Sequence, residues 1–209
     1  ELLYKIDNGR IKPSKALQDC LVSLMKGNKE FMLLDEQAVV YDMCIKTMKQ
    51  CLKDMRKRTI VIQGGPGTGK SVLAVNLLKE FTTMQINSVS GLNASYVTKN
   101  SAPREAYLRL LSKSDLKKEV NIKQLFRSPF GLCNVPTNFY DCLIVDEAHR
   151  LVKQMYGDFK GENQIKECIN ASLLTIFLID EEQQITTKDI GSVKEIEYWG
   201  NQLNSRVIV

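Results

Sequence analysis

The feature that most constrains this chain is a glycine-rich turn between two apolar segments, TIVIQGGPGTGKSVL at residues 59–73. Four glycines occur within six residues, and a lysine and a serine follow them directly. From Gly64 to Ser71 the segment fits the pattern G-x-x-x-x-G-K-[ST], placed between a predicted strand and a predicted helix. A glycine turn that binds no ligand would explain neither the Lys-Ser pair nor these flanking elements.

The chemistry of such a loop is phosphate binding. Without Cβ atoms the backbone can wrap closely around an anion and turn successive N–H groups toward it. The helix that begins near Lys70 directs its positive end at the same anion. We expect the lysine to reach the β and γ phosphates of a nucleotide and the Ser71 hydroxyl to ligate Mg²⁺. The predicted nucleotide contacts in the loop are Gly65, Pro66, Gly67, Thr68, Gly69, Lys70 and Ser71.

A second acidic site supports this interpretation. The run CLIVDE at residues 142–147 predicts a buried strand with two carboxylates at its C-terminal end, where α/β sheets place their ligands. We expect Asp146 to hold Mg²⁺ through water and Glu147 to activate the water that attacks the γ phosphate. The pair favours hydrolysis over phosphoryl transfer to a small acceptor. The alternative is two acids that serve a helix dipole, but the glycine loop upstream favours catalysis.

The rest of the chain alternates apolar strands with helices, which predicts a parallel α/β sheet covered on both faces. A helical lead-in is expected over residues 1–56, including a helix at 13–27 and another from about Asp35, and a nucleotide-binding domain over 57–209. Segments 89–91 and 134–138 are predicted loops. Strands are predicted at 59–63, 92–98, 141–146, 173–180 and 206–209, and further helices at 70–84, 102–111, 162–171 and 192–203.

Composition excludes several classes of protein. With 209 residues, 44% of them hydrophobic, the chain can bury a core, and it lacks the run of ~18 apolar residues that a membrane span needs. It opens without a signal peptide or an initiator Met, so we expect a piece of a longer cytoplasmic protein. The six cysteines show no metal-ligand spacing and are expected to be reduced and mostly buried.

A modest positive charge leaves the partner open. The net charge of +5 is compatible with a polyanion without requiring one. Basic residues at positions 46, 49, 53 and 56 recur along one face of the helix expected from Asp35. Such a stripe is either a solvated face or a contact for nucleic acid.

The sequence DEAH at residues 146–149 lies downstream of the glycine loop, whose pattern is that of a Walker A motif. Together they make the chain resemble the first RecA-like motor domain of a superfamily 1 helicase. The resemblance implies a parallel sheet in the order 5-1-4-3-2, with strands numbered along the chain. It also implies ATP with Mg²⁺ as the bound nucleotide and single-stranded DNA or RNA as the partner. A second RecA-like domain, which supplies the arginine finger in the family, is expected outside this chain.

Three further segments resemble helicase motifs. LDEQ at residues 34–37 resembles the Q motif and implies that Gln37 reads the adenine edge. DEEQ at 180–183 resembles motif III and implies Gln183 as the γ-phosphate sensor, although Ile179 replaces the usual glycine and Gln184 follows. YVTKNSAPR at 96–104 resembles motif Ia. It implies nucleic-acid contacts from Thr98, Lys99, Asn100 and Arg104.

More specifically, five segments together resemble a bacterial family of uncharacterised, Schlafen-related helicase-like proteins. They are GGPGTGKS, YVTKN-APRE, LIVDEAHRL, GENQIKE-INAS and the ID-E-Q segment. The resemblance covers most of the chain, from about Asp7 onward. The stretch GENQ at residues 161–164 has two interpretations, a helix N-terminus or a contact specific to the family.

Two functions follow from this pattern. The first is a nucleic-acid-dependent ATPase of a helicase or translocase, with Lys70, Glu147 and Gln183 as catalytic residues. The second is a regulatory switch that binds ATP without translocating. A small-molecule kinase is disfavoured by Glu147, by the motif III segment and by the lack of an arginine-rich lid. Because an arginine finger accelerates hydrolysis by roughly 10³–10⁵, we expect this chain alone to bind Mg-ATP but hydrolyse it slowly.

Overall fold

The computed structural model describes residues 32–86, 89–101, 125–153, 161–183 and 189–209. A six-stranded sheet in the order β5-β4-β6-β7-β1-β8 forms its centre, and all neighbouring strands run parallel. From edge to edge the strands are β5 Phe126–Arg127, β4 Ala94–Thr98, β6 Tyr140–Asp146, β7 Ser172–Ile179, β1 Arg58–Gln63 and β8 Arg206–Ile208.

This sheet confirms the predicted strand order and adds one strand to it. The five predicted strands correspond to β1, β4, β6, β7 and β8, which lie in the order 5-1-4-3-2. The addition is β5, a two-residue strand that pairs with Tyr96 and Val97 at the free edge of β4. It is too short to carry a periodic pattern, so only the neighbouring strand defines it.

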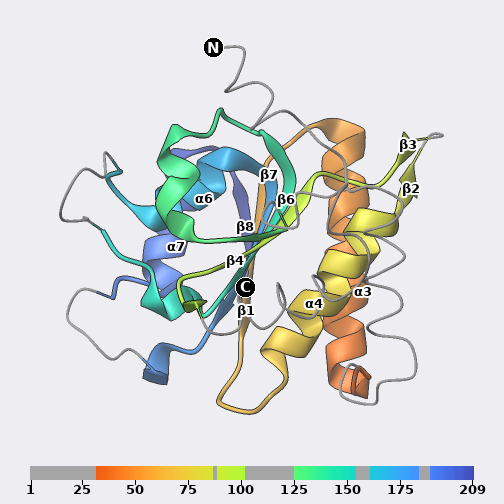
Figure 1. The fold of residues 1–209 in the computed structure, drawn as a ribbon, viewed down its shortest axis with the longest axis horizontal. Helices are drawn as coiled ribbons and strands as arrows, with labels where there is room; N and C mark the ends of the chain where they lie inside the picture. Colours follow the sequence, from red (N-terminus) through yellow and green to blue (C-terminus); the bar gives the residue numbers. More distant parts are fainter. Residues whose placement is uncertain (1–31, 87–88, 102–124, 154–160, 184–188) are drawn as a thin grey trace.

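Helices cover both faces of the sheet (Figure 1). Helices α3 (Asp35–Asp54) and α4 (Lys70–Thr83) pack on one face, and α6 (Gln164–Ala171) and α7 (Val193–Gln202) pack on the other. Alternate strand residues therefore enter two separate cores. In β6, for example, Ile144 joins the core under α3 and α4, whereas Val145 joins the core under α6 and α7. Burial on both faces explains why the strands are continuously apolar.

The connections define where a ligand can bind. From β1 the chain continues into α4 on one face, whereas β7 is followed by α7 on the opposite face (Figure 1). Because β1 and β7 are neighbours, their carboxyl ends adjoin at the point where the helices change face, which is where open α/β sheets place their ligand-binding crevice. The glycine loop follows the carboxyl end of β1, and Asp180 follows the carboxyl end of β7.

The helix expected from Asp35 is confirmed as α3, which begins at Asp35. Its inner side buries Cys44, Thr47, Met48 and Cys51, and the Tyr41 hydroxyl donates a 3.0 Å hydrogen bond to Glu80 of α4. The helix ends at Asp54 and Met55 turns the chain with a left-handed φ of 53°. The predicted helices at 13–27 and 102–111 lie outside the described residues.

The structure differs from two local predictions. Residues 89–91 were expected to form a loop, which is wrong, because Val89–Ser90 (β3) pairs antiparallel with Gln85–Ile86 (β2). A two-residue strand has no alternation to detect. The predicted loop at 134–138 is preceded by a 3-10 helix, η4 (Pro129–Asn134), so the irregular segment begins at Val135.

The GENQ stretch is a helix N-terminus. The Asn163 side chain accepts hydrogen bonds from the N–H groups of Ile165 and Lys166 at 2.9 and 3.2 Å, which caps α6. The Gln164 side chain is fully buried and accepts a 2.9 Å bond from the Val152 N–H. This residue therefore fixes the segment that follows the DEAH sequence against α6.

The cysteines are unpaired wherever they are described. Cys133 is half-buried, and the other four, Cys44, Cys51, Cys142 and Cys168, are buried. Among the residues that the structure describes, no helix combines the length and the apolar character needed to cross a bilayer.

Candidate active site

The glycine loop joins β1 to α4 at the crevice. Gly67 and Gly69 have φ values of 73° and 77°, a left-handed conformation that side chains with a Cβ rarely adopt. A Cβ placed on Gly65 or on Gly67 would meet no atom within 4 Å, so open space lies beside the loop backbone. The loop thus combines open space with backbone conformations that favour glycine.

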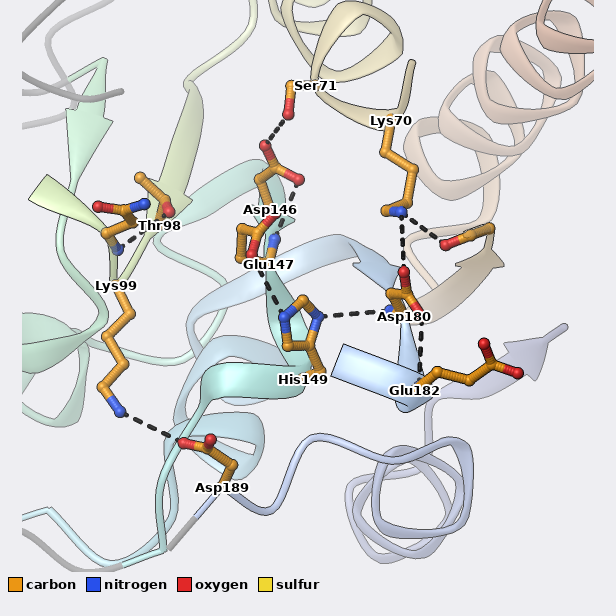
Figure 2. A network of polar contacts seen from close by, with 12 residues as sticks. Lys70, Ser71, Thr98, Lys99, Asp146, Glu147, His149, Asp180, Glu182 and Asp189 are labelled. Carbon is orange, nitrogen blue, oxygen red and sulfur yellow. Dashed lines mark hydrogen bonds and ion pairs between the residues drawn. The ribbon is translucent and has the colours of Figure 1, made fainter. Parts of the chain in front are cut away.

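Lys70 begins α4 and turns back over the loop. Its Nζ atom donates hydrogen bonds to the carbonyl oxygens of Gly64 at 2.5 Å and Gly65 at 2.8 Å. The same atom lies 3.8 Å from Oδ2 of Asp180, a carboxylate whose side chain is 4% exposed (Figure 2). The ammonium group therefore lies between the loop and the end of β7.

The predicted metal ligands lie in direct contact. The Ser71 hydroxyl donates a 2.6 Å hydrogen bond to Oδ2 of Asp146, the last residue of β6. Asp146 is 2% exposed, and its other oxygen, Oδ1, accepts a 3.0 Å bond from the N–H of Glu147. The sheet thus brings together two residues that lie far apart in the sequence.

Glu147 leaves the strand in an unusual backbone conformation. Its φ of 54° and ψ of 41° are left-handed, which costs a non-glycine residue about 1–2 kcal/mol. Oε2 of Glu147 lies 3.2 Å from Nε2 of His149. On the other side of the ring, Nδ1 of His149 accepts a 3.4 Å bond from the N–H of Asp180, so the proton of the neutral ring lies on Nε2.

His149 and Asp180 are two residues at this site to which the sequence analysis assigned no role. His149 is 1% exposed and connects the end of β6 with the end of β7 (Figure 2). Asp180 follows the apolar strand β7 in the way that Asp146 ends β6, and that repeated pattern was the signal that could have found it. His149 gave no such signal, because its position depends on a contact between segments that lie far apart in the sequence.

Gln37 contacts the glycine loop. Its Nε2 donates a 2.7 Å hydrogen bond to the carbonyl of Thr68, and its Oε1 accepts a 3.0 Å bond from the N–H of Leu34. A Cβ on Gly69 would come within 2.3 Å of Nε2, so this glycine leaves room for the glutamine. These two bonds use one amide hydrogen and one lone pair and leave one of each.

The motif III segment follows β7 directly. Gln183 ends the 3-10 helix η6 (Glu181–Gln183), and its N–H donates a 3.1 Å bond to the carbonyl of Asp180. The N–H of Glu182 donates to Oδ1 of Asp180 at 3.2 Å. This short turn keeps the backbone of Gln183 next to Asp180, and Gln184 lies outside the described residues.

The predicted nucleic-acid segment adjoins the acidic strand end. Thr98 pairs in register with Asp146, is 1% exposed and accepts a 3.2 Å bond from the N–H of Asn100. The Lys99 ammonium lies 3.6 Å from Oδ1 of Asp189, whose side chain is 2% exposed. The structure therefore shows an ion pair at Lys99, for which the resemblance to motif Ia implied a nucleic-acid contact. Arg104 lies outside the described residues.

The donor set at the crevice fits Mg²⁺. This ion is usually held by one or two protein oxygens together with phosphates and water, and Ser71 and Asp146 supply a hydroxyl and a carboxylate in contact. In addition, Oδ2 of Asp180 is buried without a hydrogen-bond partner and faces Lys70. A buried oxygen left in that state is costly, and a ligand in the crevice can relieve it.

Comparison with protein families identifies the domain. The model of the Schlafen group 3 DNA/RNA helicase domain matches residues 57–207, most of the chain. The chain belongs to this family. The RecA-like fold expected from the helicase resemblance accords with this family.

Two similar proteins give further context. Uncharacterized protein YPL245W of Saccharomyces cerevisiae is 29% identical over 155 residues, which make up 69% of this chain and 32% of the yeast protein. The chain thus spans about a third of the length of this curated relative. The crystal structure of the Pyrococcus furiosus Hef helicase domain superposes with a TM-score of 0.43 at 14% identity and covers 83% of this chain and 37% of that one.

Proposed function

We propose that this helicase-family domain binds Mg-ATP in the loop from Gly64 to Ser71 and hydrolyses its β–γ bond. The proposal rests on one observation. Five polar residues meet at the carboxyl ends of three adjacent strands, β1, β7 and β6: Lys70, Ser71, Asp146, Glu147 and Asp180. Parallel sheets bind their ligands at the carboxyl ends of their strands. The five residues supply a cation, a hydroxyl and three carboxylates.

In the proposed complex the triphosphate occupies the open space beside Gly65 and Gly67. Lys70 exchanges the carbonyl oxygens of Gly64 and Gly65 for phosphate oxygens, which carry far more negative charge. Mg²⁺, bound near Ser71 and Asp146, neutralises charge that develops on the phosphates. The amide hydrogen and the lone pair left on Gln37 match the donor and acceptor edge of adenine.

Glu147 is the proposed base that orients and activates water. Nε2 of His149 lies 3.2 Å from Oε2 of Glu147, and in the proposal this contact orients the carboxylate and leaves Oε1 for the water. The His149 ring also accepts a hydrogen bond from the N–H of Asp180. A movement of the segment from Asp180 to Gln183 would therefore shift the ring and, with it, the carboxylate of Glu147. This contact supports a role for Gln183 in sensing the γ phosphate.

Single-stranded DNA or RNA is the proposed partner, since Thr98, which pairs with Asp146, ends β4 and is followed directly by Lys99 and Asn100. An arginine finger from a second motor domain is proposed to complete the site. The test is the ATPase rate of a chain extended through that second domain, measured with and without single-stranded DNA and RNA. Stimulation of tenfold or more, abolished by Glu147→Gln, supports a motor.

A switch that binds ATP without translocating is the second candidate. The ion pair between Lys99 and Asp189 favours it, because Lys99 already has an anionic partner. ATP binding and hydrolysis that respond to no nucleic acid would select the switch. Absence of ATP binding would reject both functions.

A further inference from the structure

A tyrosine hydroxyl contacts the carboxylate proposed to hold the metal. Tyr96 lies in the middle of β4, the strand beside β6, and is fully buried. Its hydroxyl lies 2.5 Å from Oδ2 of Asp146, the same oxygen that accepts from Ser71 at 2.6 Å. With the Glu147 N–H bound to Oδ1, three donors from three segments hold this carboxylate.

These three donors differ in what they do when the site is loaded. Ser71 is itself a proposed metal ligand, and its hydroxyl lies on an exposed helix start. The N–H of Glu147 belongs to the backbone and binds Oδ1 of Asp146, the carboxylate oxygen that does not contact Ser71. The hydroxyl of Tyr96 alone among the three is a buried side-chain donor on the oxygen that faces Ser71. A short O–H···O⁻ bond of this kind is strong and directional.

We propose that Tyr96 is a positioning residue for the metal site. It holds Oδ2 of Asp146 toward Ser71, so that the carboxylate needs no rotation when Mg²⁺ arrives with the nucleotide. This inference rests on the proposed function, because it assigns Asp146 to the metal. The Tyr96 ring packs against Phe126 with its centroid 5.6 Å away, and phenylalanine can make that contact equally well. The hydroxyl therefore has a purpose beyond packing.

The test compares Y96F with a matched control, Y41F. Tyr41 also donates its hydroxyl to a carboxylate, Glu80, but joins two helices and does not contact Asp146. Each variant loses one hydroxyl–carboxylate bond and keeps the ring. The affinity for ATP is measured calorimetrically with Mg²⁺ and with EDTA, and the ratio of the two affinities gives the dependence on the metal.

We expect Y96F to reduce this ratio by about fivefold to tenfold, the scale of one typical intramolecular hydrogen bond. Its affinity in EDTA should stay within about twofold of the parent chain. The ratio for Y41F should match that of the parent. A second measurement, urea unfolding of both variants without nucleotide, reports whether the two losses of stability are comparable.

The outcomes separate the inference from the function on which it rests. If the parent and Y41F bind ATP in a Mg²⁺-dependent way and Y96F has the same ratio, the positioning role is rejected and the function stands. An unfolded Y96F beside a folded Y41F also rejects it, since the hydroxyl then serves stability. If the parent itself shows no Mg²⁺-dependent binding, the proposed function is rejected and the inference with it.

Discussion

Replacing Gly69 with alanine should destabilise the domain, by an amount that the structure determines. The residue has φ 77°, and left-handed backbone costs alanine about 1–2 kcal/mol. The new Cβ would lie 2.3 Å from Nε2 of Gln37, so the glutamine must move and lose its 2.7 Å bond to the carbonyl of Thr68. That loss is worth about 0.5–1.5 kcal/mol. The expected decrease in the free energy of unfolding is therefore roughly 1.5–3.5 kcal/mol.

Urea unfolding followed by circular dichroism measures this decrease, and Gly65→Ala is the matched control. A Cβ on Gly65 meets no atom within 4 Å, so its free energy of unfolding should change by less than about 0.5 kcal/mol, the usual range for uncrowded sites. ATP affinity should fall in Gly65→Ala, because the Cβ enters the proposed phosphate space. Equal stability of the two variants would refute the reasoning from φ and from the Gln37 contact.

Three further predictions follow from individual contacts. Glu147→Gln should keep ATP affinity within about threefold and reduce hydrolysis at least a hundredfold, as loss of a general base does; unchanged turnover in a phosphate-release assay would contradict this. Burial raises the pKa of Cys44 to about 12, so at pH 8 the thiol stays protonated. Mass spectrometry after iodoacetamide treatment should find Cys133 modified before Cys44, and the reverse order would contradict the burial. If Lys99 contacts nucleic acid, Asp189→Asn should release it from its ion pair and strengthen binding of a labelled single strand about twofold or more, whereas Lys99→Ala should weaken it; two unaffected affinities would count against that contact.

The sequence predicted those parts of the fold that local patterns encode. The run before Gly64 and the run before Glu147 are strongly apolar and end in residues with specific chemistry, so both strands and the loop were predicted. The strand order came from the resemblance to helicases, and the structure confirms it. Strand β5 was missed because two residues carry no periodicity and depend on pairing with Tyr96 and Val97.

The candidate site was only partly predictable for the same physical reason. Each motif could be found by itself, but contacts between motifs could not. His149 connects Glu147 with Asp180 across two strands, and Tyr96 reaches Asp146 from a third. In the sequence, Tyr96 resembles any other buried aromatic residue of a strand. Lys99 was expected to contact nucleic acid, and only the fold shows its ion pair with Asp189.

The central claim is that a triphosphate binds in the loop before Lys70, with its metal at Ser71 and Asp146. Calorimetric titration of ATP into the parent chain and into Lys70→Ala, each with Mg²⁺, tests it most directly. We expect the parent to bind and Lys70→Ala to bind at least tenfold more weakly, a difference of about 1.4 kcal/mol. Equal affinities for the two chains, or no binding by the parent, would contradict the claim.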